Sequence, residues 1–281
     1  FKMERTIELD NLFRLDGMVV VVTGASGLLG KKHVEAIAAF GGTPILLDLK
    51  KKIVDKLAAD INKRFNVNAI GFELDITNES EVKKNTKSLI QRFGKIDALV
   101  NNAANNPKIE DNERKDFSRL ENFQISSWDR DISVGLTGAY FCSKHYGMEI
   151  SKNSHGGVII NISSDLGLIA PDQRLYTKDN IGDQQQPVKP VTYSVTKSGL
   201  IGLTRYLSTY WPQKVRSNAI CPGGVYNNQD NSFVNKVKNK IPMGRMANVN
   251  EIQGTLVYLL SNASSYVNGA IISVDGGRTV W

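Results

Sequence analysis

The stretch MVVVVTGASGLLG, residues 18–30, decides the fold class. Its first six residues are a short, continuous apolar run, which is typical of a strand in a parallel sheet covered on both faces. Glycines at 24, 27 and 30 follow at once, and a helical pattern begins near residue 28. A tight glycine turn at a helix N-terminus presents backbone amides to a pyrophosphate. The alternative is an ordinary glycine-rich turn, but its place after the first strand favours nucleotide binding.

The same alternation of apolar runs and helical patterns continues along the chain. It predicts βαβ crossovers, and therefore an α/β Rossmann-type fold with a doubly wound parallel sheet of about seven strands. We expect one domain over residues 1–281, with insertions near 105–125 and 165–190, which are either binding loops or surface insertions without function. Strands are expected at 18–23, 44–48, 68–74, 95–101, 156–163, 215–222 and 270–277, and helices near 28–40, 51–64, 78–93, 126–150, 192–211 and 248–261.

Composition narrows the classes of partner. The net charge of +7 is spread along a chain that is 41% hydrophobic. No basic stripe with interleaved aromatic residues is present, so we expect no nucleic-acid partner. No apolar run is long enough to cross a bilayer and no signal peptide is visible, so we expect a cytoplasmic protein without a membrane partner. Cys142 and Cys221 lack CxxC spacing and the histidines lack HExxH spacing, so no metal site is expected.

Polar residues follow the next three expected strands. Asp48 closes the second strand, eighteen residues after Gly30, where an acid accepts the adenosine ribose hydroxyls and repels a 2′-phosphate. We therefore expect NAD as cofactor, with NADP left open because Lys50, Lys51 and Lys52 follow. Asp75 and NNAA, 101–104, follow the third and fourth strands at the edge where such sheets bind ligands. The candidate cofactor-binding residues here are Gly24, Ser26, Gly27, Leu28, Leu29, Gly30, Asp48, Asp75, Ile76, Asn102, Ala103 and Ala104.

Candidate catalytic residues follow the fifth strand. Ser164 ends NISS, and Tyr193 and Lys197 lie four residues apart in YSVTK, on one helix face. At this point the chain resembles the short-chain dehydrogenase/reductase family. The resemblance covers roughly residues 15–277. It rests on the glycine turn, Asp48, Asp75, NNAA (101–104), NISS (161–164), YSVTK (193–197), CPGG (221–224) and VNGAIISVDGG (267–277), in the family's order.

The resemblance implies roles for these residues. Tyr193 would be the general acid/base, Ser164 would orient substrate and phenol, and Lys197 would bind the nicotinamide ribose and lower the Tyr193 pKa. That pKa must fall by about 3 units from about 10, and one cation about 4 Å away supplies about 4 kcal/mol at an effective dielectric near 20. The alternative is a surface Tyr–Lys pair. The cofactor-binding candidates extend to Tyr193, Lys197, Pro222, Gly223, Val225 and Asn227.

Three departures from the family pattern stand out. Leu28 takes the place of the middle glycine in TGxxxGxG. Gly135 occupies the position of the family's catalytic asparagine, so we expect an altered proton relay that uses a water or a neighbour such as Ser133. Ser164 and Tyr193 are 29 residues apart, more than the family usually shows. The extra residues, within 165–190, are expected to form a substrate or oligomer-contact loop.

The substrate is predicted less narrowly. The chain is also similar to a subgroup of bacterial oxidoreductases from surface-sugar and flagellin-modification pathways. That likeness implies a small-molecule sugar or amino-sugar substrate, whose anionic groups would meet Arg114, Lys115, Arg119 and Arg174, although solvated loop charges are the plainer interpretation. A hydride-transferring dehydrogenase/reductase leads, with a nicotinamide-using epimerase or dehydratase and a non-catalytic NAD-binding protein as alternatives. The family resemblance further implies a homodimer or homotetramer through the helices near 126–150 and 192–211.

Overall fold

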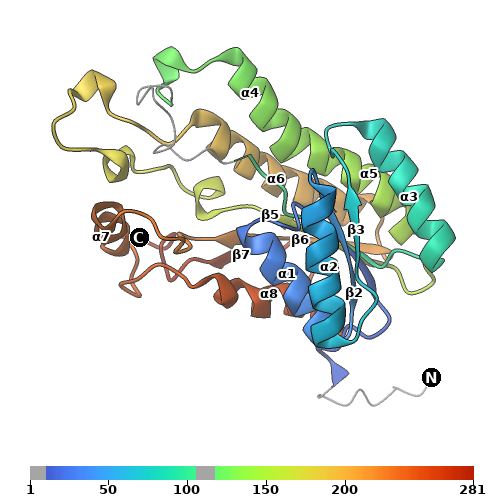
Figure 1. Ribbon diagram of the computed structural model, residues 1–281. Coiled ribbons are helices and arrows are strands. Elements are labelled where there is room, and N and C mark those ends of the chain that lie inside the picture. Colours follow the sequence, from blue (N-terminus) through green and yellow to red (C-terminus); the bar gives the residue numbers. More distant parts are fainter. Residues whose placement is uncertain (1–10, 106–117) are drawn as a thin grey trace.

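A computed structural model describes residues 11–105 and 118–281, which are arranged around one central sheet (Figure 1). All seven strands of the sheet are parallel, in the order β3-β2-β1-β4-β5-β6-β7. From β1 the chain adds β2 and β3 on one side and then returns to add β4 to β7 on the other side, so the strand order reverses between β1 and β4. This confirms the predicted doubly wound sheet. The strands are β1 (Val19–Thr23), β2 (Thr43–Asp48), β3 (Ile70–Glu73), β4 (Ala98–Asn101), β5 (Gly157–Ile162), β6 (Val215–Pro222) and β7 (Ile271–Val274).

Helices cover both faces of the sheet. One face packs on α1, α2 and α8, and the other packs on α3, α5 and α6. The strands are apolar at every position because successive side chains enter opposite cores: Val20 and Val22 face α1 and α8, whereas Val19 and Val21 face α3 and α5. These helices are α1 (Leu28–Ala39), α2 (Lys51–Phe65), α3 (Glu79–Phe93), α5 (Gly138–Ile150), α6 (Val191–Tyr210) and α8 (Gln253–Leu260).

The helix expected over 126–150 is interrupted. It consists of α4 (Ile125–Ile132), a π-helical turn (Ser133–Thr137) and α5. Gly135 lies in that turn, and a Cβ there would come within 3.0 Å of Thr196 Cγ2 on α6. The absence of a side chain at position 135 therefore allows the turn and α6 to approach each other closely. The apolar pattern of the sequence does not reveal such a turn, because a π bulge adds one residue to a helix that otherwise keeps its α-helical periodicity on both sides.

Two other segments differ from the sequence-based expectation. The segment 248–261 begins as a 3₁₀ turn (Val249–Ile252) before α8, and an unpredicted helix, α7 (Asn231–Lys238), precedes it. Residues 165–190 carry short 3₁₀ turns at Asp165–Gly167, Gln173–Tyr176 and Asp183–Gln185. Figure 1 shows this segment extending from the sheet edge above α7.

The described parts of the two insertions contact each other. The Arg119 guanidinium donates to the Asp183 carbonyl at 3.1 Å, and the Val188 amide donates to Ser118 Oγ at 3.0 Å. Arg114 and Lys115 lie outside the described residues. Within residues 11–105 and 118–281, no helix combines the length and hydropathy that a bilayer span requires.

Candidate active site

A cavity of about 1120 Å³ opens where the carboxyl ends of the strands meet. In open parallel sheets of this kind, ligands bind at this edge, near the point where the strand order reverses. We call the part lined by 24, 26–29, 48, 75–76 and 102–104 the cofactor end. The substrate end is lined by 163–166, 171–172, 175–179, 189, 193, 228–230, 232–233, 236–237, 241, 246 and 278. The predicted residues on its walls are Gly24, Ser26, Gly27, Leu28, Leu29, Asp48, Asp75, Ile76, Asn102, Ala103, Ala104, Ser164, Tyr193, Lys197, Pro222, Gly223, Val225 and Asn227.

Gly30 is the exception among the predicted residues. It is buried and does not line the cavity. A Cβ at this position would lie 2.1 Å from the Gly24 carbonyl oxygen and 2.9 Å from the Ala25 backbone. The glycine therefore lets α1 pack against the turn that precedes it. Its predicted place in the cofactor site stays a prediction.

The turn itself forms the wall of the cofactor end. Gly24 has φ +60°, and a Cβ there would lie 2.8 Å from Ala103 Cα. The Asn102 amide group donates to the carbonyls of Thr23, at 2.9 Å, and Gly24, at 3.0 Å. NNAA thus joins the end of β4 to the glycine turn, which leaves the α1 N-terminus facing the cavity.

Asp48 lies beside the same turn. Its Oδ2 accepts hydrogen bonds from the Ser26 amide, at 2.9 Å, and from Ser26 Oγ, at 2.7 Å. The next residue on the cavity wall is the apolar Leu49, whereas Lys51 pairs with Asp55 on α2. The three lysines at 50–52 do not line the cavity. None of these three lysines therefore lies on the wall beside the Asp48 carboxylate.

Ser164 follows β5 and belongs to a local hydrogen-bond network. Its hydroxyl donates to Asp165 Oδ1 at 2.7 Å, and its oxygen accepts from the Leu166 amide at 3.2 Å. Burial raises the pKa of the Asp165 carboxyl, while the hydrogen bond from Ser164 opposes the rise. Asp165 lines the cavity and was not among the predicted residues.

Lys197 lies on α6 with its ammonium group inside the cavity. Nζ donates to the Ile162 carbonyl at 2.8 Å, at the end of β5. Burial, followed by the like charge of Lys189, lowers the Lys197 pKa to about 8. Nζ lies 5.8 Å from the centre of the Tyr193 ring. The hydrogen bond fixes this ammonium between the strand end and the phenol.

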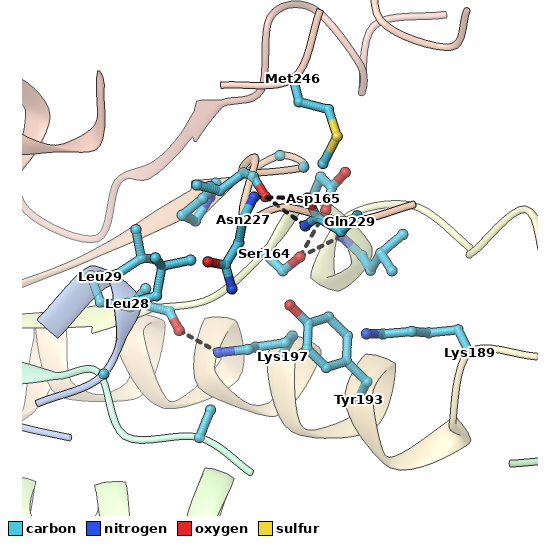
Figure 2. A pocket seen from close by; sticks show the side chains of 18 of the residues that line it. Leu28, Leu29, Ser164, Asp165, Lys189, Tyr193, Lys197, Asn227, Gln229 and Met246 are labelled. Carbon is cyan, nitrogen blue, oxygen red and sulfur yellow. Dashed lines mark hydrogen bonds between the residues drawn. The ribbon is translucent and has the colours of Figure 1, made fainter. Parts of the chain in front are cut away.

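The Tyr193 pKa is raised, chiefly by burial, and the Ser164 hydroxyl opposes that rise. Lys197, to which the family resemblance assigns the lowering of this pKa, has its Nζ 5.8 Å from the ring centre and hydrogen-bonded to the Ile162 carbonyl. That role stays a prediction. Figure 2 shows a second lysine, Lys189, on the other side of the phenol. Its Nζ lies 3.7 Å from the ring centre, and sequence reasoning missed it.

Residues around the expected asparagine position do not supply a replacement side chain. Val134 lines the cavity, whereas neither Gly135 nor Ser133 does. The Thr196 hydroxyl, next to Gly135, donates to the Thr192 carbonyl at 2.8 Å. Ser133 does not line the cavity, and its part in the relay stays a prediction.

The roof of the substrate end joins the insertion to α7. Val237, Ile241 and Met246 form a small buried cluster against which Leu175 and Phe233 pack. The rings of Tyr176 and Phe233 lie 5.6 Å apart. Polar contacts add to the apolar ones, since Asp172 pairs with Lys240 at 3.1 Å and Lys236 donates to the Thr177 carbonyl at 2.6 Å.

Of the basic loop residues expected to meet an anionic substrate, Arg174 lies outside the main cavity, where it pairs with Asp172 at 2.8 Å. Arg119 pairs with Glu121 and is likewise absent from the cavity wall. Lys189 and Arg278 line the wall instead. No group of three or more His, Cys, Asp or Glu side chains suited to a metal ion occurs in the described part of the chain.

Comparison with known proteins agrees with this architecture. A family model described as enoyl-(acyl carrier protein) reductase matches residues 24–279. The NADP-dependent mannitol dehydrogenase of Hypocrea jecorina is 32% identical over 276 residues, 96% of this chain and 95% of that protein. The D-threitol dehydrogenase of Mycolicibacterium smegmatis is 29% identical, covering 99% and 98%. A gluconate 5-dehydrogenase structure from Burkholderia cenocepacia, with NADP and tartrate, has a TM-score of 0.83 at 24% identity, covering 96% and 98%, and shows the same fold.

Proposed function

Because the chain belongs to the short-chain dehydrogenase/reductase family, we propose that it transfers a hydride between NAD(H) and a polyol or related sugar derivative. The reaction is oxidation of a secondary hydroxyl, or reduction of the matching ketone. One observation carries the proposal: Ser164, Tyr193 and Lys197 line the same cavity as the glycine turn and Asp48. Proton-transfer groups and a dinucleotide cradle therefore share one space.

The residues of the chain divide the work of proton transfer. When bound, the nicotinamide supplies the hydride acceptor or donor. The Tyr193 phenolate takes the proton of the substrate hydroxyl, or the phenol returns it to the ketone oxygen. Ser164 Oγ hydrogen-bonds Asp165 at 2.7 Å and opposes the rise of the Tyr193 pKa, so this hydroxyl can hold the substrate oxygen beside the phenol. Lys197 keeps a positive charge beside the phenol.

The preference for NAD over NADP rests on Asp48. Its carboxylate can accept hydrogen bonds from the adenosine ribose hydroxyls, and it would repel a 2′-phosphate. No lysine from the start of α2 lines the cavity to offset that repulsion. The mannitol dehydrogenase of Hypocrea jecorina is named as NADP-dependent, so this preference is the part of the proposal that differs from that relative.

The substrate class rests on the relatives and on the walls of the substrate end. The two relatives described above are dehydrogenases of mannitol and threitol, which are linear polyols. The substrate end offers polar groups on several sides, among them Asp165, Lys189 and Arg278, beneath the apolar roof. Such a mixture suits a molecule with several hydroxyl groups and a carbon chain.

A face of exposed apolar side chains supports a homo-oligomer. Tyr140 and Met148 on α5, and Val195, Tyr206 and Tyr210 on α6, are all at least 38% exposed. We propose that this face contacts a second copy in a homodimer or homotetramer, since large exposed apolar patches mark interaction sites. The oligomer should be visible as a multiple of the 31.0 kDa chain mass by light scattering.

The buried free thiols of Cys142 and Cys221 fit a reducing compartment, and we propose that the enzyme acts in the cytoplasm. Burial raises the pKa of both thiols, which keeps them protonated and unreactive. Fractionation of cells that produce the native chain would test this location.

A substrate screen tests the function. The purified protein is mixed with linear polyols, sugar acids and sugar phosphates, each with NAD and with NADP, while nicotinamide absorbance is followed. We expect NADH formation with at least one polyol, and a higher kcat/KM with NAD than with NADP. Cofactor binding without turnover across the panel, in both directions, would contradict the proposed activity. Faster turnover with NADP would contradict the role of Asp48.

A further inference from the structure

Two ammonium groups lie on opposite sides of the Tyr193 ring (Figure 2). Lys189 Nζ lies 3.7 Å from the ring centre and Lys197 Nζ lies 5.8 Å from it. In the sequence the three residues are spaced evenly, as K-x₃-Y-x₃-K at 189–197. Only Lys197 belongs to the family motif on which the proposed mechanism rests. Lys189 is the nearer of the two cations and has no role in that motif.

The insertion holds Lys189 in this position. Helix α6 begins at Val191 after Pro190, so Lys189 lies just before the first turn. Its backbone amide donates to Gln173 Oε1 at 2.8 Å, from the insertion. The preceding amide, of Val188, donates to Ser118 Oγ. These contacts from both insertions turn the lysine stem back over the first turn of α6, onto the phenol.

The charged groups near the Tyr193 phenol determine whether a phenolate is stabilised or destabilised there. Asp165, after β5, is the nearby carboxyl that acts on both Tyr193 and Lys189, and it opposes a phenolate. Arg278, after β7, acts in turn on Asp165. Burial raises the pKa values of Tyr176 and of Cys221, so both stay neutral near pH 7. Among the described residues, Lys189 and Lys197 are the cations that lie against the Tyr193 ring.

Both lysines are mainly protonated at neutral pH. Burial lowers the Lys189 pKa to about 8, while Asp165 opposes that change. A cation over the face of an aromatic ring is attracted by the ring, and it stabilises a negative charge on that ring more strongly still. Burial works in the opposite direction on Tyr193. A cation beside such a buried phenol favours the loss of its proton and so opposes the effect of burial.

We propose that Lys189 is a second cationic residue of the active site, which stabilises the Tyr193 phenolate through direct contact with its ring. Lys189 does not itself exchange a proton with the substrate; its positive charge acts on the reaction through Tyr193. The insertion at 165–190 thus contributes to the chemistry by holding this ammonium in place. The inference rests on the proposed function in taking Tyr193 as the acid/base.

The first test needs no substrate. Tyrosinate absorbance is titrated against pH in Lys189→Met, Lys189→Arg and the unmodified protein, each with and without Tyr193→Phe, so that the difference isolates Tyr193. Arginine stays charged where lysine loses its proton. Because the Lys189 pKa is about 8 and the Tyr193 pKa is raised, the lysine loses its proton before the phenol does, whereas an arginine stays charged. We therefore expect a Tyr193 midpoint about one pH unit lower in Lys189→Arg than in Lys189→Met, with the unmodified protein above the arginine variant. Equal midpoints in the three proteins would overturn the proposal.

The second test uses turnover of whichever polyol the screen identifies. In Lys189→Met the acid limb of the kcat/KM profile should move up by about one pH unit, with about tenfold loss at pH 7. Lys189→Arg should retain most activity. Lys152→Met, an exposed lysine at the opposite edge of the sheet, removes one positive charge and should change neither profile.

Two outcomes separate the possible failures. If Lys189→Met raises KM only for acidic substrates and leaves the pH profile and the Tyr193 titration unchanged, Lys189 anchors substrate and the proposal is wrong. If the protein turns over no substrate but the Tyr193 midpoint is lower in Lys189→Arg than in Lys189→Met, the electrostatic inference holds and the proposed function fails. Circular dichroism of each variant checks that it is folded.

Discussion

At the cofactor end of the cavity the wall is made largely of backbone, held by the ends of β1, β2 and β4, whereas at the substrate end it is made of side chains from loops. At the cofactor end Gly24 and Gly27 present main-chain atoms, and the Asn102 amide group holds the turn by hydrogen bonds to the carbonyls of Thr23 and Gly24. At the other end Lys189, Asp165 and Phe233 come from three separate segments. The cofactor end suits a ligand that stays the same, such as a dinucleotide. The substrate end can be altered one residue at a time to fit different substrates.

This comparison predicts that turnover and NAD binding respond to different substitutions. Tyr193→Phe removes the acid/base and should lower kcat by about 10³-fold, with the NAD dissociation constant unchanged. Tyr206→Phe, an exposed tyrosine farther along α6, serves as the matched control and should retain full activity. Steady-state turnover and a binding titration of each variant provide the measurement. Retained turnover in Tyr193→Phe would remove the phenol from the mechanism.

The backbone construction can be broken with one methyl group. In Gly30→Ala the new Cβ meets the Gly24 carbonyl at 2.1 Å, so α1 or the turn must shift. We expect a loss of about 3 kcal/mol in the free energy of unfolding, together with weaker NAD binding. Gly202→Ala, on an open face of α6, should instead stabilise by up to about 1 kcal/mol. Urea unfolding compares the two, and equal effects would show that the close approach does not matter.

Helix α1, which follows the glycine turn, carries a buried histidine whose titration makes stability depend on pH. His33 on α1 is fully buried, and burial lowers its pKa from 6.5 to about 4. Neither ring nitrogen has a hydrogen-bond partner among the described residues. Because only the unfolded state binds this proton between those values, its contribution is complete above pH 6.5 and is lost on acidification towards pH 4. The loss should reach about 3 kcal/mol.

The measurement for His33 is a series of urea titrations across that pH range. His33→Met should remove most of the slope that this residue contributes. An unchanged slope in the variant would show that His33 accepts its proton without cost in the native state, through a partner or solvent access that the packing of α1 does not indicate.

The substrate end should tolerate change with a smaller, selective effect. Phe233→Ala removes a ring from the roof, where it contacts Tyr176. We expect KM for the polyol to rise about tenfold and NAD affinity to stay constant, since the lost contact is worth about 1.4 kcal/mol. Met243→Ala, at an exposed neighbouring position, is the control. Equal losses of substrate and NAD affinity would show that the roof serves both ends.

The same contrast explains what the sequence could predict. The sheet and the residues after its strands were predictable, because continuous apolar runs such as Val19–Thr23 and the glycine turn are local signals. Lys189 and α7 were not, because their positions depend on contacts between loops distant in sequence, such as that of Gln173 with Lys189. The close packing of Gly30 on Gly24 and Ala25 could not be predicted, because a motif does not distinguish a glycine that faces a ligand from one that allows close packing. The π turn at Gly135 left no periodic trace.

The most direct test of the division between the two ends is a paired measurement on Asp48→Ala and Tyr193→Phe, in which the NAD dissociation constant and kcat at saturating NAD are determined for each protein. Asp48→Ala should weaken NAD binding about 10- to 100-fold through lost hydrogen bonds to a charged group, yet retain most of kcat. Tyr193→Phe should do the reverse. If either variant lost both properties together, or if Asp48→Ala bound NAD as tightly as the unmodified protein, the assignment of NAD binding to the Asp48 end of the cavity and of proton transfer to the Tyr193 end would be contradicted.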